Sequence, residues 1–257
     1  MISLTSTSLA RLSVDAVVVG VTGRGGALTL LGQGLPAPLA AAVTSPALGL
    51  SGEPDQVVRV PAGDALAAQV VAVVSVSDPD DPEQLRRAAG AATRQLAGLS
   101  SVALALPTRT AEQVAAVAEG ALLGAYAFTR YRAPEPRLRP VERIEVVTSQ
   151  ARTDSAKAAV TRAEVVAAAV REVRDLVNTP PADLYPGAFA DHAKAAAKGL
   201  KVKVTVLDEA ELAAGGYGGL VAVGQGSARP PRLVKVTWSP SRAKRTVALV
   251  GKGITFD

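Results

Sequence analysis

Lys252 stands between two glycines near the end of the chain, and Asp257 follows it five residues later. The apolar run at residues 247–250 predicts a strand that carries both side chains beyond its carboxyl end. Ligands of α/β folds bind at that end of the strands, and glycine lets a ligand approach the backbone closely. A carboxylate and a deprotonated amine both ligate metal ions. The spacing alone leaves a metal site and an exposed turn equally open.

Other interpretations of glycine and histidine positions are weaker. A phosphate loop of the form G-x-x-x-x-G-K-[ST] needs Ser or Thr where Gly253 stands. The run Gly23-Arg24-Gly25-Gly26 lacks the G-x-G-x-x-G spacing of a dinucleotide loop and indicates a hairpin turn. His192 lies among alanines in an expected helix, with no partner motif, as is typical of a structural or exposed histidine.

The composition limits the chemistry further. The 257 residues include no cysteine, which excludes disulfides, thiolate zinc sites, iron–sulfur clusters and a cysteine nucleophile. A single histidine excludes sites that need two imidazoles, such as those of the H-E-x-x-H zinc hydrolases. Carboxylates and amines are the metal ligands that remain.

The formal net charge of +5 is unevenly distributed. Residues 1–150 hold 12 arginines, no lysine and 13 acidic residues, a net charge of −1. Residues 151–257 hold 16 basic and 10 acidic residues, a net charge of +6. A basic segment is compatible with an anionic partner such as nucleic acid. We favour the explanation that these basic residues lie on solvated helix faces and in the active site, because they form no cluster in which aromatic residues alternate with basic ones.

The N-terminal residues do not have the pattern of a secretory signal. No basic residue precedes Arg11, and Asp15 interrupts the apolar stretch. The longest apolar windows, at residues 16–21 and 70–76, are shorter than the roughly 18–20 residues of a membrane helix. We therefore expect a cytoplasmic protein with no membrane partner.

Residues 1–150 alternate apolar, β-branched runs with alanine-rich segments, which predicts an α/β domain. The runs are continuously apolar, as in a mainly parallel sheet covered on both faces. Asp81-Pro82 and Thr110 are expected to begin two of the helices. The expected strands lie at residues 15–21, 69–76, 101–107 and 141–148, and the expected helices at residues 36–43, 82–98 and 111–126.

A long amphipathic helix is expected from Thr153 to about Val177, and Asn178-Thr179-Pro180-Pro181 ends it. Its apolar residues recur at spacings of three and four: Ala156, Val160, Ala163, Val166, Val170, Val173 and Val177. Such a helix spans roughly 37 Å at 1.5 Å per residue, which is long enough to connect two domains. We therefore predict an N-terminal α/β domain at residues 1–150, a connecting helix at 151–178 and a second α/β domain that begins at 179–257.

The second domain again alternates helices and strands. Its expected helices lie at residues 187–199 and 209–216, and its expected strands at residues 201–208, 219–227, 232–240 and 246–253.

Three segments, in this order, resemble successive signatures of the leucyl (cytosol) aminopeptidase family. They are RDLVNTPPADLYP at residues 174–186, GLVAVGQGS at 219–227 with Pro230-Pro231-Arg232-Leu233, and VGKGITFD at 250–257. The resemblance covers the whole chain as the N-terminal domain, the connecting helix and the start of the catalytic domain of that family. It implies a macro-domain-like N-terminal α/β domain and the beginning of a di-zinc-exopeptidase-like α/β catalytic domain.

By the family motif, Lys252 would ligate one metal ion and Asp257 would bridge both. The resemblance thus implies two divalent metal ions per subunit, manganese or zinc. The remaining acidic ligands and the family's catalytic lysine and arginine belong to later motifs that these 257 residues do not contain. No catalytic residue is therefore assigned here, and we expect the 257-residue chain alone to be inactive.

The resemblance implies that the protein is a metal-dependent aminopeptidase, which removes neutral, leucine-like N-terminal residues from peptides. It also implies that the protein assembles as a homohexamer. Some members of the family also bind DNA as accessory factors, so DNA is an alternative partner of the same protein. A nucleotide-like ligand in the N-terminal domain, as in macro domains, is a third alternative, and no residue of the sequence argues for it.

Overall fold

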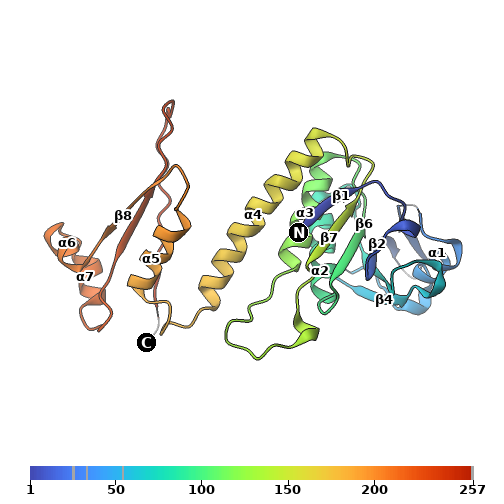
Figure 1. The fold of residues 1–257 in the computed structure, drawn as a ribbon, viewed down its shortest axis with the longest axis horizontal. Helices are drawn as coiled ribbons and strands as arrows, with labels where there is room; N and C mark the ends of the chain where they lie inside the picture. Colours follow the sequence, from blue (N-terminus) through green and yellow to red (C-terminus); the bar gives the residue numbers. More distant parts are fainter. Residues whose placement is uncertain (25–26, 33, 54, 256–257) are drawn as a thin grey trace. The chain divides into compact units, whose positions relative to one another are not determined.

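The computed structural model describes residues 1–24, 27–32, 34–53 and 55–255. The chain forms two compact units, residues 1–174 and 175–257. The division falls inside the long helix α4 (Asp154–Asn178), which is shown in yellow to orange in Figure 1. The domain boundaries expected from the sequence, with residues 151–178 as a separate connecting helix, remain predictions.

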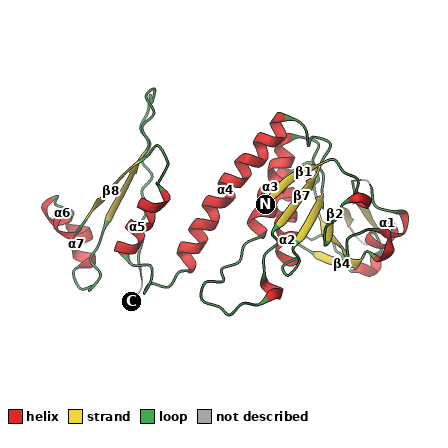
Figure 2. Cartoon of the chain, viewed as in Figure 1, coloured by secondary structure: helices red, strands yellow, loops and turns green. Residues whose placement is uncertain are grey.

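The N-terminal unit is built on a seven-stranded sheet with the order β1-β7-β6-β2-β5-β4, and β3 pairs with β2 (Figure 2). Four neighbouring pairs are parallel: β1 with β7, β7 with β6, β6 with β2 and β2 with β5. β4 is antiparallel to β5, and β3 is antiparallel to β2. This confirms the expected α/β class with a mainly parallel sheet. The strands are β1 (Ile2–Thr5), β2 (Ala16–Arg24), β3 (Ala27–Leu31), β4 (Val57–Pro61), β5 (Val70–Ser75), β6 (Ser101–Ala105) and β7 (Arg143–Val147).

Helices cover both faces of this sheet, which explains the continuously apolar strands. Figure 1 shows α2, α3 and α4 on one side and α1 on the other. Alternation along the strands divides the core accordingly: Val18 and Val74 belong to the cluster with α2, α3 and α4, while Val19 and Val73 belong to the cluster with α1. The helices are α1 (Ala37–Val43), α2 (Pro82–Gln95) and α3 (Ala111–Gly124), with short 3-10 turns at Leu9–Arg11, Pro46–Leu48, Gly63–Ala65 and Pro136–Leu138.

Asp15 ties the amino ends of three strands together. Its carboxylate oxygen Oδ2 accepts hydrogen bonds from the amides of Ser100 (2.9 Å) and Ser101 (2.8 Å) and from Ser101 Oγ (3.0 Å). Its main-chain oxygen accepts from the amides of Gln69 and Val70 at the start of β5. The acidic residue that interrupts the apolar stretch therefore sets where β2, β5 and β6 begin.

The helix starts expected from the sequence are confirmed. Asp81 accepts a hydrogen bond from the amide of Glu83 at the start of α2. Thr110 Oγ1 accepts one from the amide of Gln113 at the start of α3, and Gln113 Oε1 accepts one from the amide of Thr110. These side chains satisfy amides that a first helical turn leaves without partners.

Helix α4 buries one face in the N-terminal unit, but over a shorter stretch than its apolar pattern suggested. Ala156, Val160, Ala163 and Ala167 are buried. Val173 and Val177 are 58% and 79% exposed, so the last apolar residues of the pattern are not buried in the described chain. The buried face ends where the helix leaves the core cluster that contains α2 and α3.

The glycine-rich run near residue 23 lies at a hairpin, as the sequence predicted. β2 and β3 pair antiparallel, with Arg24 opposite Ala27. Gly23 has a φ of 135°, a conformation that L side chains rarely adopt. Gly25 and Gly26 lie outside the described residues.

The second unit contains a two-stranded antiparallel sheet and three short helices. Two expectations are wrong here. Residues 219–227 were expected as a strand, but they overlap a helix, because a short apolar run does not by itself distinguish the two. Residues 246–253 form no strand, since nothing in the described chain pairs with them. The elements are α5 (Pro186–Ala196), β8 (Lys203–Leu207), α6 (Glu209–Ala214), α7 (Gly218–Gly224) and β9 (Leu233–Thr237).

Within the described ranges, no helix is both long enough and apolar enough to cross a membrane.

Candidate functional site

Lys252 lies in the segment that follows β9, and its side chain is exposed. A Cβ atom added at Gly251 or Gly253 would meet no other atom within 4 Å, and neither glycine has a positive φ. The space beside both glycines is therefore open in the described chain, and the approach of a ligand to them stays a prediction. Asp257 lies outside the described residues, so its position relative to Lys252 stays a prediction.

The described residues do not by themselves fit a two-metal centre. No three His, Asp or Glu side chains come together among residues 1–24, 27–32, 34–53 and 55–255 in a way that could hold a metal ion. A lysine ligates a metal only after losing its proton, and burial or the cation itself must displace that proton. Lys252 is exposed in the described part of the chain.

The loop before β9 is braced to three helices of the second unit. Arg232 Nη1 donates to Glu209 Oε2 at the start of α6 (2.7 Å) and to the main-chain oxygen of Pro231 (2.8 Å). The Pro231 ring packs against Gly224 at the end of α7, where an added Cβ would lie 2.5 Å from the ring. The Arg229 guanidinium lies 4.0 Å from the Tyr185 ring centroid, next to the start of α5. These contacts account for three residues of the resembling segments: Gly224, Pro231 and Arg232.

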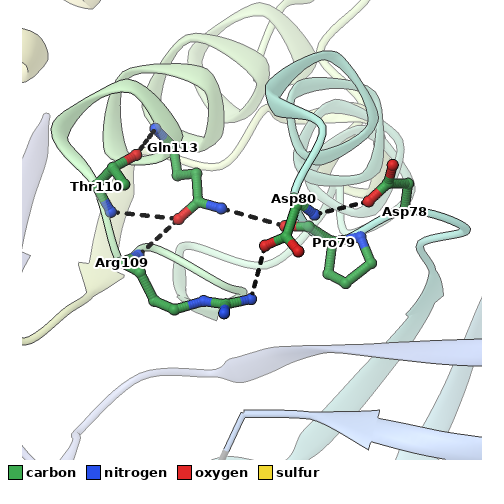
Figure 3. Close-up of polar contacts among 6 residues, drawn as sticks. All are labelled: Asp78, Pro79, Asp80, Arg109, Thr110 and Gln113. Atoms are coloured by element: carbon green, nitrogen blue, oxygen red, sulfur yellow. Dashed lines mark hydrogen bonds and ion pairs between the residues drawn. The ribbon is translucent and has the colours of Figure 1, made fainter.

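The carboxyl edge of the N-terminal sheet contains a second concentration of polar side chains, drawn in Figure 3. Gln113 is buried there, and its Oε1 accepts from the amides of Arg109 (2.8 Å) and Thr110 (3.2 Å). Its Nε2 donates to the main-chain oxygen of Pro79 (3.2 Å), which joins the loop after β5 to the loop after β6. Arg109 also pairs with Asp80 at 2.9 Å across the same two loops.

The loop after β7 is joined to the same edge. Thr108 Oγ1 donates to the main-chain oxygen of Val147 (3.1 Å), and Thr148 Oγ1 donates to that of Thr108 (2.9 Å). Gln150 Nε2 donates to the main-chain oxygen of Arg109 (3.1 Å). The hydrogen-bonding capacity of these side chains is thus used to hold the three loops together.

The sequence predicted that Thr110 caps a helix, but it did not point to this edge of the sheet or to its network. The pattern T-x-x-Q at residues 110–113 is the signal of a capping box and was available in the sequence. The bond from Gln113 to Pro79 joins residues 34 positions apart, and no local pattern indicates it. His192 is half-buried on α5 in the second unit.

Two family models match the chain. The model of the N-terminal domain of the cytosol aminopeptidase family matches residues 18–135. The model of the catalytic domain of the same family matches residues 171–257. The two matches follow one another in the order of the two units of the structure.

Individual relatives agree with these matches. A probable cytosol aminopeptidase from Leifsonia xyli subsp. xyli is 50% identical over 247 residues, which cover 95% of this chain and 48% of that protein. The bottromycin maturation enzyme BotP in complex with Mn is 31% identical with a TM-score of 0.68, covering 89% of this chain and 46% of that one. A mutant of tomato leucine aminopeptidase shares the fold, with a TM-score of 0.75 and 20% identity over 95% of this chain and 52% of that one.

The chain spans about half the length of the curated relatives that it matches. The three resembling segments and the two domain matches nevertheless lead to one assignment. This chain belongs to the cytosol aminopeptidase family.

Proposed function

We propose that this chain is part of a metal-dependent aminopeptidase that removes neutral, leucine-like N-terminal residues from peptides through a two-metal site. The observation that carries the proposal is the match of both domains of one peptidase family, in order, along a single chain. Divalent metal dependence is supported by the BotP neighbour, which is described in complex with Mn. Manganese or zinc is the proposed ion.

In this proposal Lys252 would be a ligand of one ion, and Asp257 would be a ligand that both ions share. Two bound cations would polarise the peptide carbonyl and the attacking water. Within the described part of the chain no three His, Asp or Glu side chains come together to hold a metal ion, so the proposed site would also require Asp257 and acidic side chains from outside these 257 residues. The role of the described residues is to position the segment, and the braced loop at residues 229–232 anchors the strand from which it extends.

The proposal extends to assembly and location. We propose peptide substrates, a homohexamer as the working form and a cytoplasmic location. Size measurement of the full-length protein by analytical ultracentrifugation tests the assembly, and a monomer at micromolar concentration would contradict it.

Hydrolysis of a chromogenic leucine anilide tests the activity. We expect turnover by the full-length protein with added manganese or zinc, and none by the mass-verified 257-residue chain. In the full-length protein, Lys252→Met should abolish turnover and lower the affinity for the metal. Lys244→Met removes another exposed lysine of the same segment and should change neither. Comparable turnover by the 257-residue chain, or by the Lys252→Met protein, would overturn the site assignment.

DNA is the second candidate partner, and the net charge of residues 151–257 is the observation that favours it. The 16 basic and 10 acidic residues of this stretch leave a net charge of +6. Binding through phosphate contacts weakens steeply as salt rises. An electrophoretic mobility assay of the full-length protein at two salt concentrations tests this, and absence of a shift at low salt would remove the candidate.

A further inference from the structure

We propose that Arg174 is a clamp that holds the second half of α4 against the end of α3. Its Nη1 donates a hydrogen bond to the main-chain oxygen of Leu123 at 2.9 Å. Its guanidinium carbon also lies 5.2 Å from the centroid of the Tyr126 ring. Both contacts fall within the N-terminal unit, of which Arg174 is the last residue.

The position of Arg174 on the helix indicates why a clamp is needed there. Ala156, Val160, Ala163 and Ala167 form the buried face of α4, at spacings of four, three and four. Arg174 follows Ala167 by seven residues, which is about two turns, so it continues the same face. After Ala167 the helix has left the apolar core, and a polar contact replaces the apolar ones.

The partner atoms are suited to an arginine. Leu123 is the next-to-last residue of α3, and carbonyl groups in the last turn of a helix lack intrahelical partners. A cation is also favoured near the negative end of the helix dipole. The planar guanidinium can donate a hydrogen bond in its plane while one face lies over an aromatic ring, whereas a lysine ammonium lacks that planar geometry.

The clamp gives a role to Arg174, which the proposed metal site does not use. Arg174 begins the first of the three segments that resemble the family signatures. By holding α4 to α3 at the last residue of the N-terminal unit, it keeps this stretch of the helix packed on that unit. The inference concerns helix dynamics and does not depend on aminopeptidase activity.

Amide hydrogen exchange of the whole chain, read at residue resolution, tests the clamp. In Arg174→Met the amides of residues 170–178 should exchange about tenfold faster, corresponding to the loss of roughly 1.4 kcal/mol of local protection. Arg174→Lys should have an intermediate effect, because the charge is kept but the planar fork is lost. Amides of β2 and α2 serve as internal references and should not change.

Arg171→Met is the matched control. Arg171 lies one turn earlier on α4 and is also half-buried, but it makes no hydrogen bond or ion pair with the described residues. Its replacement should leave exchange at residues 170–178 unchanged. Equal acceleration in the Arg171 and Arg174 variants would overturn the clamp. So would unchanged exchange in Arg174→Met, or acceleration that is uniform across β2, α2 and α4, because each shows that Arg174 does not act locally on the helix end.

Discussion

Gly120 on α3 faces the main-chain carbonyl of Arg86 on α2 so closely that a Cβ atom at Gly120 would overlap the Arg86 oxygen. Gly124 faces the carbonyl of Gly90 one turn further along in the same way. The two helices therefore touch through their backbones. Glycine is required at these positions for close packing and not for a special φ, since neither Gly120 nor Gly124 has a positive φ.

Gly120→Ala should therefore destabilise the N-terminal unit although alanine is the better helix former. Alanine gains about 1 kcal/mol in helix propensity, but separating two packed helices costs more, and a net loss of about 1–3 kcal/mol is expected. Urea unfolding followed by circular dichroism measures it. Gly219→Ala, in α7 with open space around it, is the control and should be neutral or stabilising. A Gly120→Ala protein as stable as the wild type would contradict the close helix contact.

Asp15→Ala removes an acceptor that three donors share. The amides of Ser100 and Ser101 and the Ser101 hydroxyl lose their bonds to the carboxylate, and Ser101 is buried. Buried donors that are left without an acceptor destabilise the folded state, so we expect the free energy of unfolding to fall by about 2–4 kcal/mol. Chemical denaturation gives the value. Asp64→Ala removes an exposed acidic residue of the same unit and should cost less than about 0.5 kcal/mol. Equal effects of the two changes would show that the Asp15 contacts contribute little.

The same substitution at two buried threonines should have different effects. Thr148 Oγ1 donates to Thr108 and accepts from the Gln150 amide, so Thr148→Val should lose about 1–2 kcal/mol. Thr93 Oγ1 is buried without a hydrogen-bond partner in the described chain, so Thr93→Val should be neutral or stabilising by up to about 1 kcal/mol. Thermal unfolding of the two variants side by side decides this. A larger loss at Thr93 than at Thr148 would refute the assigned hydrogen bonds.

Glu83 should give the first turn of α2 a small pH-dependent stabilisation. The hydrogen bond from Arg86 is the main cause that lowers the pKa of Glu83 below its usual value of 4.5. A lowered folded-state pKa stabilises the protein above the unfolded-state value, and the benefit is lost as the pH falls through the folded-state value. The glutamate side chain is 55% exposed, so solvent screens the pair.

We therefore expect Glu83→Gln to cost about 0.3 kcal/mol at pH 7, and the cost should shrink as the pH falls from 7 through the folded-state pKa of Glu83. Denaturant titrations across that pH range measure the difference. Glu112→Gln changes the corresponding first-turn glutamate of α3, which has no ion pair among the described residues. It should show a smaller change with pH. If the difference in the free energy of unfolding between Glu83→Gln and wild type grew as the pH fell, the ion pair would not be its cause.

Much of the N-terminal unit could be predicted from the sequence because its signals are local. Continuous apolar runs predicted β2, β5, β6 and β7, and the cap residues Asp81 and Thr110 mark the starts of α2 and α3. The strands β1, β3 and β4 were not among the predicted strands. Each lies at an edge of the sheet, where a strand is paired on one side and its sequence carries a weaker signal.

The second unit was harder to predict for a physical reason. The apolar run at residues 219–227 fits a strand or a helix equally well, and the packing of Gly224 against Pro231 accompanies the helix α7. Residues 246–253 have the composition of a strand, yet Leu249 is 94% exposed and the segment has no strand partner in the described chain. A strand depends on hydrogen bonds to a neighbour, which its own residues do not specify.

The sequence alone determined the family, through the order of three segments, and the fold class, through the alternation of strands and helices. It also pointed to Lys252 and Asp257, whose roles remain predictions. Only the tertiary structure decided that Gly120 must lack a side chain, that Asp15 joins the starts of three strands and that Arg174 contacts the end of α3. Each of these depends on a partner 34 or more residues away. Periodicity and capping patterns report the local backbone, and which distant atom lies opposite a side chain is settled when the chain packs.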